Sequence, residues 1–140
     1  MTSALERTAP SVRLEIPPQS AYVAIARLAI TSLGRAAGLD EEKLDDLKIA
    51  ISESCANAVL SAQEAGVDSP IEISFTAAPD ELEVVVGHSG PAPAEVVEED
   101  SHGFSTQRVM SMALLRSLVD ELDLSPRAGG GVEARLLLRR

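Results

Sequence analysis

The segment Ile49-Ala50-Ile51-Ser52-Glu53-Ser54-Cys55-Ala56-Asn57-Ala58-Val59 sets one carboxylate and one carboxamide in a mostly apolar run. Glu53 and Asn57 are four residues apart, so on a helix they share a face, with Cβ atoms about 5–6 Å apart. Apolar residues fall on both sides of this helix, which predicts that it is buried on both. Ionisable groups are rarely buried without a partner or a purpose. The pair is therefore either a hydrogen-bonded contact at the helix edge or part of a functional site.

One side of this helix carries an apolar stripe that predicts its main contact with the core: Leu44, Leu47, Ile51, Cys55, Ala58 and Ala62. The other side carries Glu53 and Asn57 together with Ile49, Ala56 and Leu60. Because Cys55 lies on the stripe, a buried structural thiol is favoured over a thiol–imidazole pair or a metal site with His88 or His102.

Size and composition predict one domain with an aliphatic core. The chain has 140 residues, of which 45% are hydrophobic and only 2% aromatic. We expect a flexible tail over 1–10 and a single domain over 11–140. No apolar run approaches the roughly 20 residues that span a bilayer, and the first ten residues lack a signal-peptide pattern. A lone cysteine excludes an internal disulfide framework. These features predict a cytoplasmic protein.

The charge balance indicates the kind of partner. With 12 basic and 22 acidic residues, the formal net charge is −10. Such a surface repels phosphate backbones, which argues against direct DNA or RNA binding. It suits a basic protein partner, such as a factor that itself binds nucleic acid.

Strand and helix patterns follow one another along the chain. Alternating apolar residues predict strands near 12–16, 71–76, 82–86, 119–124 and 132–139. Capping signals predict helices at 20–37, 40–66 and 105–118, with Asp40 as a cap. This order predicts an α+β two-layer sandwich, a mixed, mostly antiparallel sheet of about five strands covered on one face by three helices. A long loop over 87–103 is the second place to expect a site.

This order of elements and the segment around Glu53 and Asn57 together resemble a known family. Residues 46–59 (DLKIAISESCANAV) resemble the N box of the GHKL ATP-binding fold. They resemble more closely that of the bacterial anti-sigma-factor serine kinases: a leucine, two to three residues, Ala-Val-Ser/Asp-Glu, three residues, then Asn-Ala-Val. Residues 114–122 resemble the family's helix-to-strand segment, and Gly129–Gly131 before a strand resembles its last hairpin. The likeness covers about 12–139.

The resemblance implies roles for individual residues. Glu53 would be the general base for a partner's serine hydroxyl, and Asn57 would hold the Mg²⁺ that bridges the ATP phosphates. Phosphoryl transfer needs such a metal and an aligned nucleophile, and an amide oxygen suits a hard cation. Arg27 falls where the family places an arginine that contacts the sigma factor; a solvated helix charge is an equally good interpretation. The family also implies a homodimer.

The positions that would hold the nucleotide depart from the family pattern. The first glycine box, Asp-x-Gly-x-Gly, is replaced by His88-Ser89-Gly90-Pro91-Ala92. His88 lacks the charge of the aspartate that binds adenine, and Ala92 adds a methyl group where backbone must approach the ligand. Ser111 stands in the expected second glycine box, and Val132 replaces a threonine.

Charges in the loop point the same way. Glu98, Glu99 and Asp100 would repel a triphosphate, and Arg108 offsets only part of that repulsion. The candidate nucleotide-binding positions are His88, Gly90, Ala92, Gly103, Arg108, Ser111 and Val132. These changes predict weakened or lost binding of ATP and Mg²⁺.

Three functions are consistent with this sequence. The first is an anti-sigma regulator that sequesters a sigma factor and responds to an antagonist protein. The second is an active Mg-ATP-dependent serine kinase that phosphorylates that antagonist. The third is a non-catalytic dimeric scaffold. The pair Glu53 and Asn57 indicates kinase ancestry, whereas the altered glycine boxes favour the first or third function.

Overall fold

A computed structural model describes residues 10–88, 102–127 and 131–140, with the backbone alone over 102–108. The elements in chain order are β1 (Ser11–Ile16), η1 (Ser20–Tyr22), α2 (Val23–Ala36), α3 (Glu41–Ala65), β2 (Ile71–Ala77), β3 (Glu81–His88), α5 (His102–Leu118), β4 (Glu121–Pro126) and β5 (Val132–Arg139).

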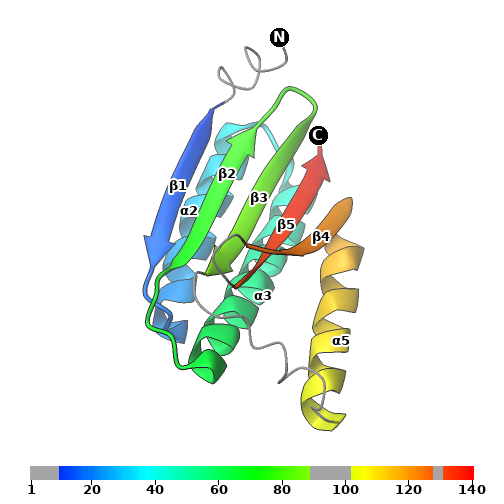
Figure 1. Ribbon diagram of the computed structural model, residues 1–140. Helices are drawn as coiled ribbons and strands as arrows, with labels where there is room; N and C mark the ends of the chain where they lie inside the picture. The colour runs from blue at the N-terminus through cyan, green and yellow to red at the C-terminus, as the bar shows by residue number, and fades with distance from the viewer. Residues whose placement is uncertain (1–9, 89–101, 128–130) are drawn as a thin grey trace.

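The described strands form one sheet with the order β1-β2-β3-β5-β4. Each strand is antiparallel to its neighbours. Helices α2 and α3 lie behind β1, β2 and β3, and α5 lies beside β4 (Figure 1). The predicted α+β two-layer sandwich is confirmed. None of the described helices is long and apolar enough to cross a membrane.

Local signals set the limits of α3. The Asp40 side chain accepts a hydrogen bond from the Lys43 backbone N–H at 2.9 Å, as an N-cap does. At the other end Gly66 has φ 68°, the left-handed conformation that ends many helices. Both predicted ends of this helix are confirmed.

Three predicted boundaries are wrong. Strand β3 continues to His88, which pairs with Ile71, and α5 begins at His102. The predicted loop over 87–103 therefore shrinks at both ends. A glycine inside a helix costs only about 1 kcal/mol, so Gly103 does not prevent helix formation. Strand β4 starts at Glu121 instead of 119, because its pairing with β5 begins where Glu121 faces Leu137.

The core lies between the sheet and α3. Strand β2 alternates strictly, with Ile71, Ile73 and Phe75 buried. On α3, Leu44, Leu47, Ile51, Cys55 and Ala62 are buried as predicted, whereas Ala58 is half-buried. The prediction that both sides of α3 are buried is wrong, because Ile49 is 47% exposed and Ala56 is exposed as well. One face of α3 packs against the sheet, and α2 and α5 add buried residues such as Ile30 and Leu115 to the same core.

Helices α2 and α3 approach closely at Gly34. A Cβ atom there would lie 2.8 Å from Cδ2 of Leu47 and 3.3 Å from Cδ2 of Leu44. Both leucines are fully buried, so they have little room to move. The missing side chain therefore sets the spacing between the two helices.

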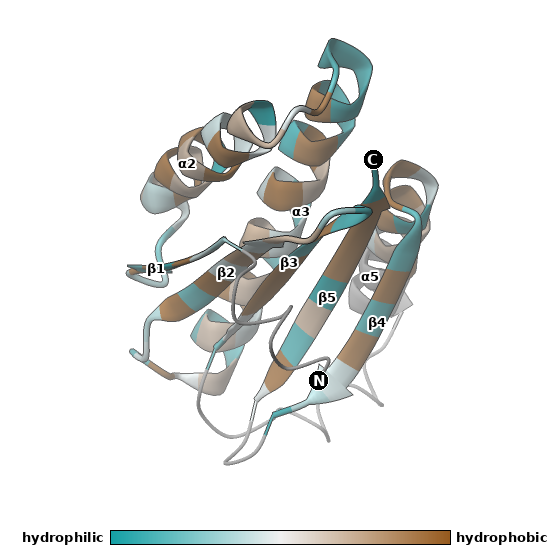
Figure 2. Cartoon of the chain, turned by 90° about the horizontal axis from the view of Figure 1, so that it is seen from above, coloured by the Kyte–Doolittle hydropathy of each residue, from teal (hydrophilic) through white to brown (hydrophobic). Residues whose placement is uncertain are grey.

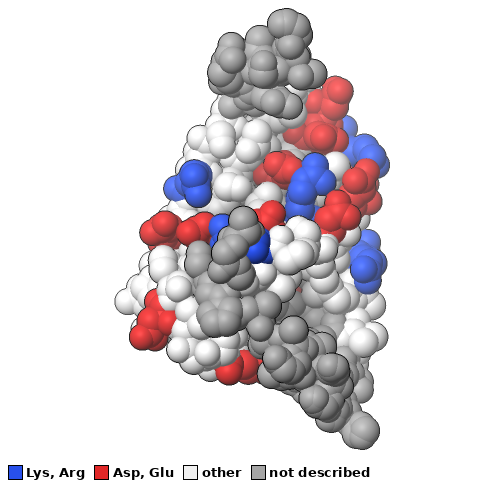
Figure 3. All heavy atoms as spheres, in the orientation of Figure 1, with Lys and Arg blue, Asp and Glu red and all other residues white. Residues whose placement is uncertain are grey.

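The sheet face opposite the helices is covered by paired charges. Cross-strand ion pairs join Arg135 to Glu83, and Arg127 to Glu72 at 2.6 Å. The hydrogen bond from Arg127 holds the pKa of Glu72 below its ordinary value. Both signs are interspersed over this face (Figure 3). Charged and apolar residues alternate along β4 from Glu121 to Leu124 and along β5 from Val132 to Leu136 (Figure 2), so the charged positions of these strands remain in contact with water.

Candidate functional site

The pair singled out by the sequence lies on α3 and meets α5. The Ser111 hydroxyl donates a hydrogen bond to Oε2 of Glu53 at 2.7 Å. The Nδ2 atom of Asn57 donates to the same hydroxyl oxygen, also at 2.7 Å. A hydroxyl donates one hydrogen bond and also accepts, so one serine bridges both members of the pair. Ser111 is buried, at 7% exposure, while Glu53 and Asn57 are half-buried.

Arg27 lies on α2 and reaches α3 beside this pair. Its Nη1 atom donates to the Ser52 hydroxyl at 3.0 Å, and that hydroxyl donates to the Lys48 carbonyl at 2.9 Å. Arg27 is half-buried, so it is more than a solvated helix charge. This hydrogen bond is to the residue before Glu53, not to the carboxylate.

A small cavity of about 140 Å³ lies next to Asn57. His88, at 2% exposure, and Val132 also line it. Ser54 contributes a buried hydroxyl that has no hydrogen-bond partner in the described part of the chain. The fold thus brings three predicted site residues, Asn57, His88 and Val132, to one cavity.

A second cavity of about 360 Å³ adjoins the first. Leu60, Val109 and Arg116 line only this one, and both cavities share Asn57, Met112 and Leu124. The two cavities are therefore neighbours, and α3, α5 and β4 each contribute one of the residues that they share.

The other predicted nucleotide positions are not brought to this site by described side chains. Gly90 and Ala92 lie outside the described residues, as do the acidic residues 98–100. Gly103 lies in the backbone of α5, so its placement in the loop is wrong. Arg108 and Ser111 lie on α5, within the helix predicted over 105–118.

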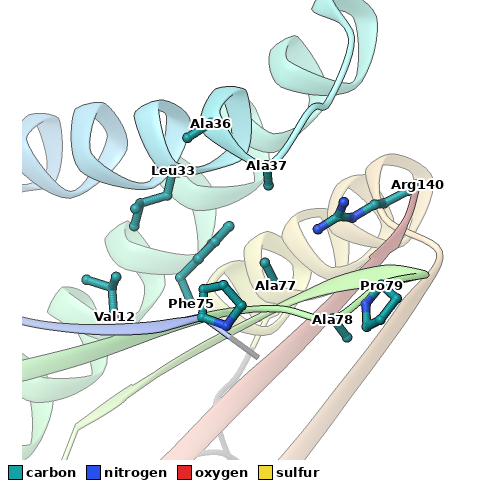
Figure 4. Close-up of a pocket in the computed structure, with 10 residues that line it drawn as sticks. Val12, Leu33, Ala36, Ala37, Phe75, Ala77, Ala78, Pro79 and Arg140 are labelled. Atoms are coloured by element: carbon teal, nitrogen blue, oxygen red, sulfur yellow. The ribbon is translucent and has the colours of Figure 1, made fainter. Parts of the chain in front are cut away.

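A larger apolar cavity of about 470 Å³ lies elsewhere, between the end of α2 and the sheet (Figure 4). Leu33, Phe75 and Pro79 line it, and Arg140 is the charged residue in its lining. It contains none of the site residues predicted from the sequence.

Comparison with known proteins identifies the family. The family described as Histidine kinase-like ATPase domain matches residues 16–136. The chain belongs to this family. Its relatives include the serine-protein kinase RsbW of Bacillus pumilus, 28% identical over 97% of this chain and 91% of the relative. RsbW of Listeria monocytogenes is 34% identical over 56% of this chain and 50% of the relative. The resemblance to this group of kinases is confirmed.

A solved structure supports the fold. The chain is similar to the crystal structure of the RsbU and RsbW domains of a Mycobacterium tuberculosis protein, with a TM-score of 0.68 and 20% identity. The match covers 93% of this chain and 32% of that one, so the chain spans about a third of the solved protein.

An ATPase domain family implies a nucleotide, with Mg²⁺ as its usual metal. The described residues do not fit that group in this arrangement. The Ser111 hydroxyl donates to Oε2 of Glu53 and accepts from Nδ2 of Asn57, so a side chain of this protein stands where the resemblance would place a partner's hydroxyl. Mg²⁺ requires close oxygen ligands in near-octahedral geometry, and Ser111 lies between the two side chains that the resemblance assigns to catalysis and metal.

Proposed function

We propose that this protein is an anti-sigma regulator that binds and sequesters a bacterial sigma factor, responds to an antagonist protein, and has weakened or lost ATP binding. The observation that carries this proposal is the Ser111 hydroxyl, hydrogen-bonded to both Glu53 and Asn57 at 2.7 Å. A carboxylate that is already bonded to a hydroxyl of its own chain is not open to a substrate hydroxyl. The relatives carry the name serine-protein kinase RsbW, so they support this family and keep the kinase open as the alternative.

The proposed partner surface is the outer side of α2 around Arg27. Ile25 is 51% exposed and Leu28 is 68% exposed, and these two residues flank Arg27 in the sequence. Ile25 and Leu28 are three residues apart and share one face of α2, and exposed apolar side chains match the composition of protein interfaces. The net charge of −10 suits a basic partner. We further propose a cytoplasmic homodimer that binds neither nucleic acid nor membrane.

We expect Arg27→Glu to weaken binding of the sigma factor about tenfold or more, because a negative charge would face the partner in place of a positive one. Affinity is measured by isothermal titration against a panel of purified bacterial sigma factors. Arg35→Glu is the matched control, since Arg35 is exposed on the same helix and makes a 3.8 Å ion pair with Glu41. Equal losses for both variants would contradict the role of Arg27, and no binding by any sigma factor would contradict the regulator itself.

The alternative function is an active serine kinase. One observation favours it: Glu53 accepts a hydrogen bond from a serine hydroxyl at 2.7 Å, the contact that a general base makes with its nucleophile. In that case Glu53 would act on the antagonist's serine, and Asn57 would hold Mg²⁺.

We expect no shift in the thermal unfolding midpoint of the wild-type protein with millimolar Mg-ATP. A ligand at about 100 times its dissociation constant would add roughly 2.7 kcal/mol, which raises the midpoint of a domain of this size by several degrees. Scanning fluorimetry with and without Mg-ATP measures this, and magnesium alone serves as the control. A rise of several degrees specific to Mg-ATP would favour the kinase.

A further inference from the structure

Helix α5 is attached to the rest of the domain by few buried side chains. Of its side chains described, those of residues 109–118, only Ser111 and Leu115 are buried, at 7% and 0% exposure. They are four residues apart and therefore lie on one face. Val109 and Met110 are 67% and 65% exposed. The fully buried attachment of this part of α5 is thus Leu115 and the Ser111 hydroxyl, and the half-buried Met112 and Leu118 pack against the core beside them.

The Ser111 hydroxyl has a hydrogen-bond partner on α3 both as a donor and as an acceptor. Glu53 accepts its proton, and Asn57 donates to its oxygen. A hydrogen bond to a carboxylate is stronger than one between neutral groups. Because Glu53 and Asn57 are one turn apart, Ser111 joins two successive turns of α3 to α5.

The bond between Ser111 and α3 also holds in place a residue that lines both cavities beside Asn57. The two cavities share Asn57, Met112 and Leu124. Met112 follows Ser111 on α5, so the helix that Ser111 holds also carries part of the partition. Movement of α5 away from α3 would join the cavities next to Asn57.

We propose that Ser111 is an internal lock that fastens α5 to α3 and keeps a magnesium–nucleoside triphosphate away from Glu53 and Asn57. The Ser111 hydroxyl stands toward Glu53 as the hydroxyl of a phosphate-accepting serine would. It also bonds Nδ2 of Asn57, the residue implied to bind the metal. A substrate hydroxyl must displace Ser111 from Glu53, and a triphosphate needs α5 to move from its place beside Asn57. The apparent dissociation constant of such a ligand therefore rises by the reciprocal of the open fraction. The nucleotide in this proposal rests on the proposed function, whereas the fastening of α5 does not.

The test compares full-length wild type with Ser111→Ala. Hydrogen exchange is expected to become about tenfold faster or more in amides 109–118, because two hydrogen bonds that hold the helix are lost. Amides of β2 and β3 serve as the internal reference and should keep their rates, which separates opening of α5 from general destabilisation. Isothermal titration with Mg-ATP should show affinity higher by a similar factor. Ser117→Ala is the matched control, since Ser117 is exposed on α5 and bonds only to the Leu114 carbonyl of its own helix, at 2.7 Å.

A second variant keeps the test decisive if Ser111→Ala folds poorly. Asn57→Ala should also speed exchange in α5, and the double variant should add little to either single one, because both changes open one lock. Unchanged α5 exchange in Ser111→Ala would overturn the proposal. Phosphate on Ser111 after incubation of the wild type with Mg-ATP would overturn it too, since the hydroxyl would then be an acceptor. If Ser111→Ala speeds exchange in the amides of α5 but still binds no Mg-ATP, the result would support the fastening of α5 by Ser111. It would contradict the nucleotide-excluding role of Ser111 and the kinase function.

Discussion

Ile51→Ala is expected to lower the free energy of unfolding by about 2–5 kcal/mol, the usual cost of removing a large aliphatic side chain from a packed core. Ile51 is 0% exposed and faces the sheet from the middle of α3. The loss combines reduced burial of apolar surface with the cavity left behind. Urea unfolding followed by circular dichroism, extrapolated to water, measures the change.

Ile49→Ala is the matched control on the same helix. Ile49 is 47% exposed, so we expect a change within about 0.5 kcal/mol. The higher helix propensity of alanine offsets part of the lost contact. Equal losses at the two positions would mean that α3 is buried on both sides, in a dimer for example, and would contradict the burial described for the single chain.

Local patterns predicted the elements well because their causes are local. The alternation in 71–76 places Ile71, Ile73 and Phe75 on one face of any strand, and this face is buried. Asp40 and Gly66 mark the ends of α3 through their own backbone and side-chain chemistry. The fold class then followed from the element order.

Features that depend on distant partners were not predictable in the same way. An apolar side chain such as Ile49 has the same pattern whether a neighbour covers it or water does. The start of β4 depends on its register with β5, where Glu121 pairs with Leu137. Neither relation has a signal within a short window of sequence.

In the candidate site, too, local features were predictable and contacts between distant residues were not. Helical spacing was enough to place Glu53 and Asn57 on one face. Their bond to Ser111 joins residues 58 and 54 positions apart, and the predicted helix over 105–118 did not indicate which residues Ser111 would meet. The available signal was a lone serine in the apolar run Val109-Met110-Ser111-Met112-Ala113-Leu114-Leu115, which on a buried helix face requires a hydrogen-bond partner.

The stability of the protein is expected to fall steeply above pH 9 because of Cys55. Burial raises the pKa of this thiol from 9.0 to about 12. Between these values the unfolded chain loses the thiol proton and the folded chain keeps it. The folded state then binds one more proton, so the free energy of unfolding falls by about 1.4 kcal/mol for each pH unit. Below pH 9 both states are protonated and the thiol contributes no pH dependence.

Urea unfolding at intervals between pH 8 and 11 measures this slope, and Cys55→Ala should remove the part of it that belongs to the thiol. Groups that titrate in every variant cancel when the two curves are subtracted. Val59→Ala controls for a general loss of stability, because Val59 is 4% exposed on the same helix and this variant retains the thiol. If Cys55→Ala and wild type keep parallel curves, the thiol reaches water in the folded protein. The stripe of α3 that covers the sheet would then be open at its centre, because Cys55 lies one turn after Ile51.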